Sequence, residues 1–255
     1  MCRIKLLNTE VDNLTMDEAI KEIEKLILKK KISYVVTPNV DHIVKLESDS
    51  EMKEAYMNAD LILTDGMPLV WISKIKSTSI KEKISGSDLF PKVCELAAKK
   101  GYTVFLLGAA QGVAQKAAEN LINKFDGLNI VGTYSPKYGF ENDKEEVQHI
   151  LNIINDKKPD ILAVGLGAPK QEKFIYKYRN ELKVPVSLAI GAGIDFEAGV
   201  VSRAPVWMQK HGMEWFYRLC KEPRRMAKRY LIDDFKIIPI MFRYRKQNID
   251  NIRRF

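Results

Sequence analysis

Six short apolar runs, each followed by a loop and then by a helical pattern, constrain the fold of this 255-residue chain most strongly. Short β-branched runs of this kind are typical of strands that are buried on both faces of a sheet. Their alternation with amphipathic helices predicts an α/β fold, a Rossmann-like and mostly parallel sheet with helices on both faces. The expected strands are 33–37, 61–64, 103–108, 128–134, 161–165 and 184–191.

Helical patterns fill the segments between these strands. Thr15 and Glu18 have the spacing of a capping box, and isoleucines follow at 20, 23 and 27. A polar helix is expected over 40–58, and another is expected to begin at a Ser87 cap and to end at Gly101. Further helices are expected near 110–125, 142–156 and 169–180.

Polar and small residues gather where the expected strands end. The five strand ends that carry them are 37–39, 64–66, 108–112, 165–171 and 191–195. In open parallel sheets, ligands bind beyond the carboxyl ends of the strands. We therefore expect these five loops to line one shared crevice.

The segment GLGAPKQEKF, residues 165–174, has the build of an anion-binding turn. Pro169 at the first helical position would leave the N–H groups of Ala168, Lys170 and Gln171 facing the crevice, at the positive end of the helix dipole. Gly165 and Gly167 would let an anion approach the backbone. An ordinary tight turn explains the segment equally well. Neither the Lys-Ser or Lys-Thr pair of a P-loop nor the third glycine of a dinucleotide fingerprint is present.

The segment from Gly108 to Gly112, which includes Ala109, repeats this design one strand away, with the same ordinary alternative. Two such turns in one sheet favour a nucleotide with a diphosphate over a single phosphate. A dinucleotide cofactor is disfavoured because the glycine pattern that would hold it is missing.

Asp65 directly follows an expected strand and precedes Gly66, so its carboxylate is well placed to act as a general base. An Asx-turn before the next helix is the alternative. Thr37 and Asn39, at the neighbouring strand end, could orient a hydroxyl group or could simply form the turn. Asp195 and Glu197 are the nearest approach to a metal site, and without histidine support they predict no essential metal.

The charge of the chain is concentrated at its end. Residues 203–255 carry 14 Lys and Arg against 5 Asp and Glu, whereas the first 202 residues carry 27 against 28. We therefore predict a catalytic domain over 1–202 and a basic, aromatic appendage over 203–255 that meets something anionic. A helix pair packed on the sheet with a solvated basic face is the alternative, above all for 207–219.

Arginines mixed with aromatic residues suit a membrane surface or a nucleic acid. On a membrane, basic residues of the appendage would meet lipid phosphates, and an apolar group would enter the acyl boundary; that group is Ile237, Ile238, Ile240, Met241 and Phe242. The chain has no uncharged apolar run of about 18 residues and no signal-peptide core in its first ten. The three cysteines are scattered and suggest no disulfide framework, so we expect the protein to lie in a reducing cytoplasm.

Seven blocks in order make the sequence resemble the WecG/TagA/CpsF family of bacterial glycosyltransferases, glycosyltransferase family 26. They are TPNVDHIV, LTDGMPLVW, SGSDL, FLLGAAQGVA, VGLGAPKQEKFI, GAGIDFEAG and RAPVWMQKHGMEWFYRLCKEPRRMAKRY. The resemblance implies an inverting, metal-independent transfer from a UDP-sugar to a polyprenyl-diphosphate-linked sugar at the inner face of the plasma membrane. It also implies a peripheral appendage that docks on the membrane and completes the active site, in the synthesis of teichoic acid or another surface polysaccharide.

The resemblance also assigns residues. The base falls on Asp65 and the active-site threonine on Thr37, and the appendage groups that meet the lipid diphosphate fall on Arg218, Arg225 and Lys228. Lys228 stands where a relative has arginine. Lys83 stands where the family often has one, and lysine there keeps the charge but loses the bidentate geometry. With the strand-end residues, the expected donor-nucleotide site comprises Asn39, Gly66, Lys83, Gly108, Ala109, Gly165, Gly167, Ala168, Lys170, Gln171, Gly191 and Asp195.

Two other classes of protein remain open from the residues alone. A nucleic-acid-binding protein would use the same basic tail, and a dinucleotide-dependent oxidoreductase would share the sheet. We expect neither nucleic acid nor a cofactor as partner, but a UDP-sugar, a lipid-linked acceptor and an anionic membrane. N-acetylmannosamine, its uronic acid and glucose all stay open as the donor sugar, and so does a homo-oligomer.

Overall fold

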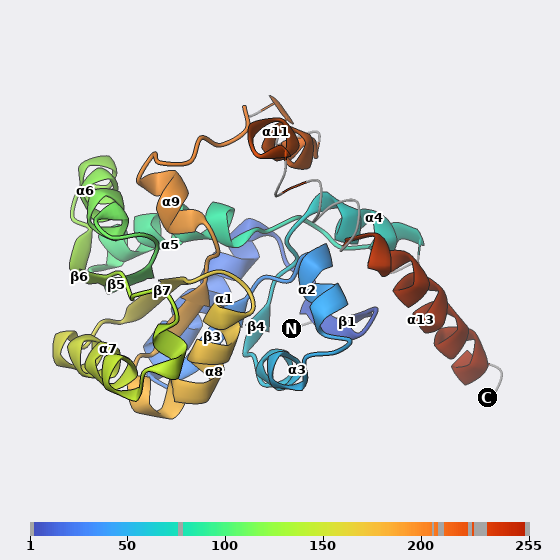
Figure 1. Cartoon of the computed structure of the whole chain (residues 1–255), viewed down its shortest axis with the longest axis horizontal. Helices are drawn as coiled ribbons and strands as arrows, with labels where there is room; N and C mark the ends of the chain where they lie inside the picture. The colour runs from blue at the N-terminus through green and yellow to red at the C-terminus, as the bar shows by residue number, and fades with distance from the viewer. Residues whose placement is uncertain are drawn as a thin grey trace.

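A parallel sheet forms the centre of the computed structural model, which describes residues 3–75, 79–205, 207–208, 212–223, 226 and 234–252. Within these residues the sheet has six strands in the order β4-β3-β8-β7-β5-β6 (Figure 1). The strands are β3 Ser33–Val36, β4 Leu61–Ile62, β5 Thr103–Gly108, β6 Asn129–Tyr134, β7 Ile161–Gly165 and β8 Val186–Ala189. All six predicted strands are confirmed, and so is the α/β class.

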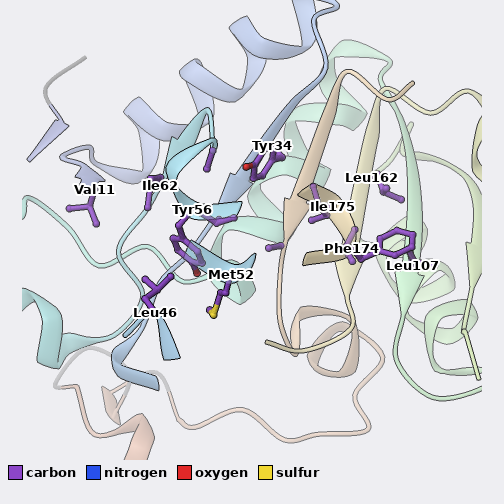
Figure 2. Packing of buried hydrophobic residues seen from close by; sticks show 14 of the residues in the cluster. Val11, Tyr34, Leu46, Met52, Tyr56, Ile62, Leu107, Leu162, Phe174 and Ile175 are labelled. Atoms are coloured by element: carbon purple, nitrogen blue, oxygen red, sulfur yellow. The ribbon is translucent and has the colours of Figure 1, made fainter. Parts of the chain in front are cut away.

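Helices cover both faces of the sheet, because successive side chains of each buried strand point to opposite faces. Val35 packs into a cluster with α1 and α5, while Tyr34 and Val36 join the cluster on the other face. Figure 2 shows that second cluster, in which Tyr34 and Leu162 of the sheet meet Phe174 and Ile175 of α8. The helices of the sheet domain are α1 Met16–Lys29, α2 Val40–Lys45, α3 Ser50–Met57, α4 Met67–Ile75, α5 Gly86–Lys100, α6 Val113–Lys124, α7 Lys144–Lys157, α8 Lys170–Leu182 and α9 Gly193–Glu197, with a 3-10 turn η1 at Phe140–Asn142.

The predicted helix signals are mostly confirmed, with three corrections. The capping box of Thr15 and Glu18 is present, and Gly101 ends α5 in the left-handed conformation. The cap of α5 is Ser85 rather than Ser87. The single helix expected over 40–58 is two, because Asp49 caps a new helix by accepting the N–H of Met52. The third correction, at Pro169, concerns the functional site.

A two-stranded antiparallel hairpin precedes the sheet domain and was not predicted. It consists of β1 Arg3–Leu6 and β2 Thr9–Asp12. Its strands are short and largely polar, so they carry little of the hydrophobic signal by which strands are recognised. The buried carboxylate of Asp12 joins the hairpin to β4 by accepting the N–H of Ile62 at 2.8 Å.

The C-terminal segment includes α11 Glu214–Lys221, a 3-10 turn η3 at Asp234–Lys236 and α13 Ile237–Ile252. Ile240 of α13 is buried in the same cluster as α2, and Ile237 and Met241 pack against that cluster. The expectation that Ile240 enters a membrane is therefore wrong, because protein covers it here, whereas Ile237 and Met241 are only partly buried. Ile238 and Phe242 are exposed. Among the described residues, no helix combines the length and apolarity needed to cross a bilayer.

Candidate active site

A cleft of about 680 Å³ opens at the carboxyl ends of four neighbouring strands. Its lining includes residues from the loops after β3, β4, β8 and β7, and these loops meet because the strands are adjacent in the sheet. The cleft therefore brings together seven predicted site residues: Thr37, Asn39, Asp65, Gly167, Ala168, Gln171 and Gly191. Its volume lies within the range of about 300–1,000 Å³ that small-molecule sites occupy.

A second, smaller hollow of about 140 Å³ adjoins the first. Gly66, Lys83, Met67 and Pro68 line it, together with Trp215 of α11. Asn39, Asp65 and Ser87 line both spaces. Asp65 therefore lies on the boundary between a polar cleft above the sheet and a hollow that the C-terminal segment helps to enclose.

The backbone around Asp65 is fixed at the end of β4. The Asp65 N–H donates to the carbonyl of Pro38 at 2.8 Å, and the side chain is half-buried. Gly66 adopts a φ of +97°, and a Cβ there would meet only the Pro68 ring. A ligand group can thus approach the carboxylate closely. Several carboxylates act on the nearby Tyr56 hydroxyl. Burial is the largest cause that raises the pKa of Tyr56 well above its ordinary value, and the charges of Glu172, Asp65 and Asp41 raise it further.

The turn at Pro169 differs from its prediction. Pro169 is the N-cap residue, α8 begins at Lys170, and the N–H of Gln171 is not free but donates to Gly167 at 3.0 Å. The Gln171 side chain is buried, where Oε1 accepts the N–H of Gly191 and Nε2 donates to Glu172. Lys170 pairs with Glu141 and does not line the cleft. The turn is therefore more internally bonded than its sequence indicates.

The turn at Gly108, after β5, does not form an open anion-binding site in this structure. The Ala109 N–H donates to the carbonyl of Gly165 at 3.2 Å, and neither Gly108 nor Ala109 lines the cleft. Glycine is needed at 108 for packing, since a Cβ would lie 2.3 Å from the Gly165 carbonyl oxygen. Gly165 itself lies close to Gly191, whose carbonyl oxygen is 3.0 Å from the position of a Cβ at 165. These two glycines let neighbouring strand ends approach each other closely.

Asp195 and Glu197 do not form a joint metal-binding pair. Asp195 lies in the first turn of α9 and does not line the cleft, whereas Glu197 pairs with Lys124 of α6 at 3.1 Å. Neighbouring Phe196 does line the cleft. The predicted place of Asp195 in the nucleotide site is thus not supported by its position.

Comparison with known proteins decides the class of this site. The sequence model of the glycosyl transferase WecG/TagA/CpsF family matches residues 4–251. The chain belongs to this family. It is therefore a glycosyltransferase, and the resemblance seen in its motifs is confirmed.

Three relatives share one name, N-acetylglucosaminyldiphosphoundecaprenol N-acetyl-beta-D-mannosaminyltransferase. The protein of Bacillus subtilis (strain 168) is 30% identical over 226 residues, which are 88% of this chain and 86% of the relative. The protein of Bacillus spizizenii is 33% identical over 200 residues, 78% of this chain and 76% of the relative. That of Staphylococcus aureus (strain MW2) is 26% identical over 240 residues, 93% and 90% of the two chains.

In this glycosyltransferase, the basic groups assigned to phosphate binding are only partly described. Lys83 lines the smaller hollow, where its ammonium pairs with Asp88 at 2.8 Å. The backbone of Arg218 lies in α11, but its side chain is outside the described part of the structure, and Arg225 and Lys228 lie outside the described residues altogether. Two further cations, Lys45 and Lys236, line the larger cleft and were not predicted.

Sequence reasoning also missed a buried pair at the cleft, His42, which lines it, and Glu172, which lies behind His42. Both stand inside recognised blocks, yet each reads as an ordinary helical residue. Only the fold brings them together, with Nε2 of His42 lying 3.3 Å from Oε1 of Glu172. A charged residue on an apolar face of the α8 pattern, between Gln171 and Phe174, was the signal that could have revealed Glu172.

Proposed function

We propose that this chain transfers N-acetylmannosamine from its UDP derivative to an N-acetylglucosamine linked to polyprenyl diphosphate. The names of the relatives support both the sugar and the acceptor. The observation that carries the proposal is the position of Asp65, on the boundary shared by two adjoining spaces. A transferase needs its base where donor and acceptor meet, and this boundary is such a place.

The larger cleft would hold the donor. Its polar lining, with Asn39, Lys45 and the first turn of α8, suits a nucleotide diphosphate. The smaller hollow would receive the terminal sugar of the acceptor, whose lipid part would leave past Trp215 and the C-terminal segment. Aromatic side chains beside polar groups are well suited to the faces of a sugar ring.

The reaction would be a single displacement with inversion. Asp65 takes the proton of the acceptor hydroxyl as that oxygen attacks the anomeric carbon of the donor. The bond from this carbon to the diphosphate oxygen breaks, and its electron pair leaves with UDP. Thr37, buried at the end of β3, would orient the reacting groups. Lys83 and the appendage groups Arg218, Arg225 and Lys228 would stabilise the departing diphosphate and the acceptor diphosphate.

We further propose that the enzyme works without a metal, at the inner face of the plasma membrane and as a peripheral protein. The basic appendage would meet anionic lipid, where each basic residue contributes about 1 kcal/mol near the surface. The lipid-linked substrate named for the relatives supports membrane association. Transfer should therefore survive EDTA and should rise when anionic vesicles carry the acceptor.

A donor screen tests the proposal. A synthetic N-acetylglucosaminyl diphospholipid is incubated with several UDP-sugars, and products are read by mass. We expect the mass of one added N-acetylhexosamine from UDP-N-acetylmannosamine, and Asp65→Asn should slow it by about 10²–10⁴-fold while still binding UDP. Asp126→Asn, on an exposed loop, is the matched control and should transfer normally. Preference for a different UDP-sugar would overturn the donor, and rapid transfer by Asp65→Asn would overturn the mechanism.

A further inference from the structure

Glu172 is an uncommon residue for its position. Its carboxylate is fully buried in the first turn of α8, beneath the cleft. Burying a carboxylate costs several kcal/mol unless partners compensate, and apolar replacements of buried ion pairs are often neutral or stabilising. Stability alone therefore gives little reason for a glutamate here. Oε2 also accepts no hydrogen bond from the described residues, which adds to its cost.

One arm of contacts runs from Glu172 to the loop after β3. The edge of the His42 ring that carries Nε2 faces Oε1 of Glu172 at 3.3 Å. The opposite edge, with Nδ1, meets Asn39 twice, at 2.7 Å from Oδ1 and at 3.2 Å from the backbone N. Since Oδ1 is thereby held toward the ring, the amide nitrogen on the same carbon faces away from it. Asn39 lines both spaces beside Asp65.

A second arm runs from Glu172 to the loop after β8. Nε2 of Gln171 donates to Oε1 of Glu172 at 2.8 Å, and Oε1 of Gln171 accepts the N–H of Gly191 at 3.1 Å. Gly191 also lines the cleft. Burial raises the pKa of Glu172, but the nearby His42 ring and the hydrogen bond from Gln171 outweigh burial and hold this pKa below its ordinary value. The carboxylate is thus charged, with the His42 ring against it on one side and a hydrogen bond from Gln171 on the other.

We propose that Glu172 is a positioning residue that holds two walls of the active cleft, acting through His42 on Asn39 and through Gln171 on Gly191. The two walls follow β3 and β8, which are neighbours in the sheet, and Glu172 lies on α8, which follows the third strand of the group, β7. A single buried group therefore sets the relative position of three strand-end loops. This inference rests on the proposed function only for its effect on catalysis.

Hydrogen exchange tests the two arms without any substrate. In Glu172→Leu, which removes the oxygen that both arms contact, amides of both 37–45 and 188–196 should exchange at least about tenfold faster. In His42→Leu, only 37–45 should change, because the Gln171 arm remains. Asp160→Asn is the matched control: it removes a carboxylate that bonds Thr103 at the other end of the strands, and both loops should stay protected. Unchanged exchange in the two loops, or equal acceleration throughout the domain, would overturn the proposal.

Kinetics supply a second readout. Misplacement of catalytic groups by about 1 Å can cost about 10²-fold in rate, so kcat of Glu172→Leu should fall by about 10–100-fold with KM for the donor within about threefold. His42→Gln places an amide nitrogen near the position of Nε2, where it can donate to Glu172, and should recover part of the kcat that His42→Leu loses. A kcat of Glu172→Leu close to wild type would contradict the inference. If wild type transfers nothing, the proposed function fails, while the exchange pattern still decides the positioning role.

Discussion

The ammonium of Lys83 lies 2.8 Å from the Asp88 carboxylate. Lys83 lines the smaller hollow and Asp88 does not, so an ion pair with a residue outside the hollow fixes this cation in place. Asp88 also accepts hydrogen bonds from Ser85, at 2.7 Å, and from Arg203. Burial raises the pKa of Asp88, but the charge and hydrogen bond of Lys83, the charge of Arg203 and the Ser85 bond together hold it below its ordinary value. The three polar partners make Asp88 the centre of a cluster that joins the start of α5 to the segment after α9.

Asp88→Asn should therefore destabilise the fold in a pH-dependent way. A carboxyl group whose pKa is lower in the folded state adds stability above its unfolded pKa of about 3.9, and this stability is lost as pH falls through the folded value. We expect the variant to lose about 1.5–3 kcal/mol at pH 7, the range for hydrogen bonds to charged groups. Urea unfolding of both proteins at pH 7 and near pH 3 checks this. A gap that stays constant over the whole range would contradict the assignment.

Lys83 should contribute to transfer through its charge. The smaller hollow that Lys83 lines shares Asp65 with the larger cleft proposed for the donor, so the charge of Lys83 would act on the departing diphosphate across that boundary. Lys83→Ala should lower kcat by about 10²-fold, the effect of losing one transition-state donor, and Lys83→Arg should keep most of the activity. Lys81→Ala removes a nearby lysine that pairs with Glu18 on the surface and should leave transfer unchanged. Steady-state kinetics with the lipid-linked acceptor distinguish these outcomes, and an unimpaired Lys83→Ala would remove Lys83 from the mechanism.

Gly108 should tolerate no side chain. Its φ is +128°, and a Cβ would lie 2.3 Å from the carbonyl oxygen of Gly165 on the neighbouring strand. Gly108→Ala should cost more than about 3 kcal/mol, because backbone strain and a backbone clash add together. Gly101→Ala is the matched control, since its φ is +74° and nothing lies within 4 Å of the added carbon. It should cost only about 1 kcal/mol. If both variants lost the same free energy of unfolding in urea, the close approach of β5 and β7 would not be what restricts residue 108 to glycine.

Most of the strands were predictable because they are buried on both faces and so appear as continuous apolar runs, such as TVFLLG for β5, whereas β6 at the edge of the sheet is only partly buried. Their order was not, because it depends on which strands pair. Once the carboxyl ends of parallel strands are known to share one edge, the meeting of Asp65, Asn39 and Gly167 follows. The hairpin of β1 and β2 escaped prediction because short polar strands carry no such signal.

The directions of side chains and N–H groups in the site could not be predicted. An N–H at the start of a helix is free or bonded according to local turn geometry, and Gln171 donates to Gly167 where the sequence indicated a free donor. The contact between His42 and Glu172 depends on the packing of α2 against α8, which no local pattern encodes. The appendage was ambiguous for another reason: an apolar stripe on a helix suits a lipid surface and a protein core equally.

That ambiguity gives a prediction for α13, whose apolar residues divide between two surfaces. Ile240 is buried against the core, whereas Ile238 and Phe242, four residues apart, are exposed on another side of the helix. Ile240→Ala should lower the free energy of unfolding by about 2 kcal/mol or more through the cavity it leaves. The double variant Ile238→Ala/Phe242→Ala should change stability by less than about 1 kcal/mol.

The same two variants, Ile240→Ala and Ile238→Ala/Phe242→Ala, distinguish packing against the core from contact with a membrane. Each apolar CH₂ group buried in the bilayer contributes about 0.8 kcal/mol, so the double variant should lose about tenfold or more in affinity for anionic vesicles. Ile240→Ala should keep that affinity at temperatures where it remains folded. Sedimentation with vesicles of anionic phospholipid, beside urea unfolding, measures both quantities. Undiminished sedimentation of the double variant would show that the exposed side of α13 does not meet the membrane, and would leave contact to the basic residues between α11 and η3.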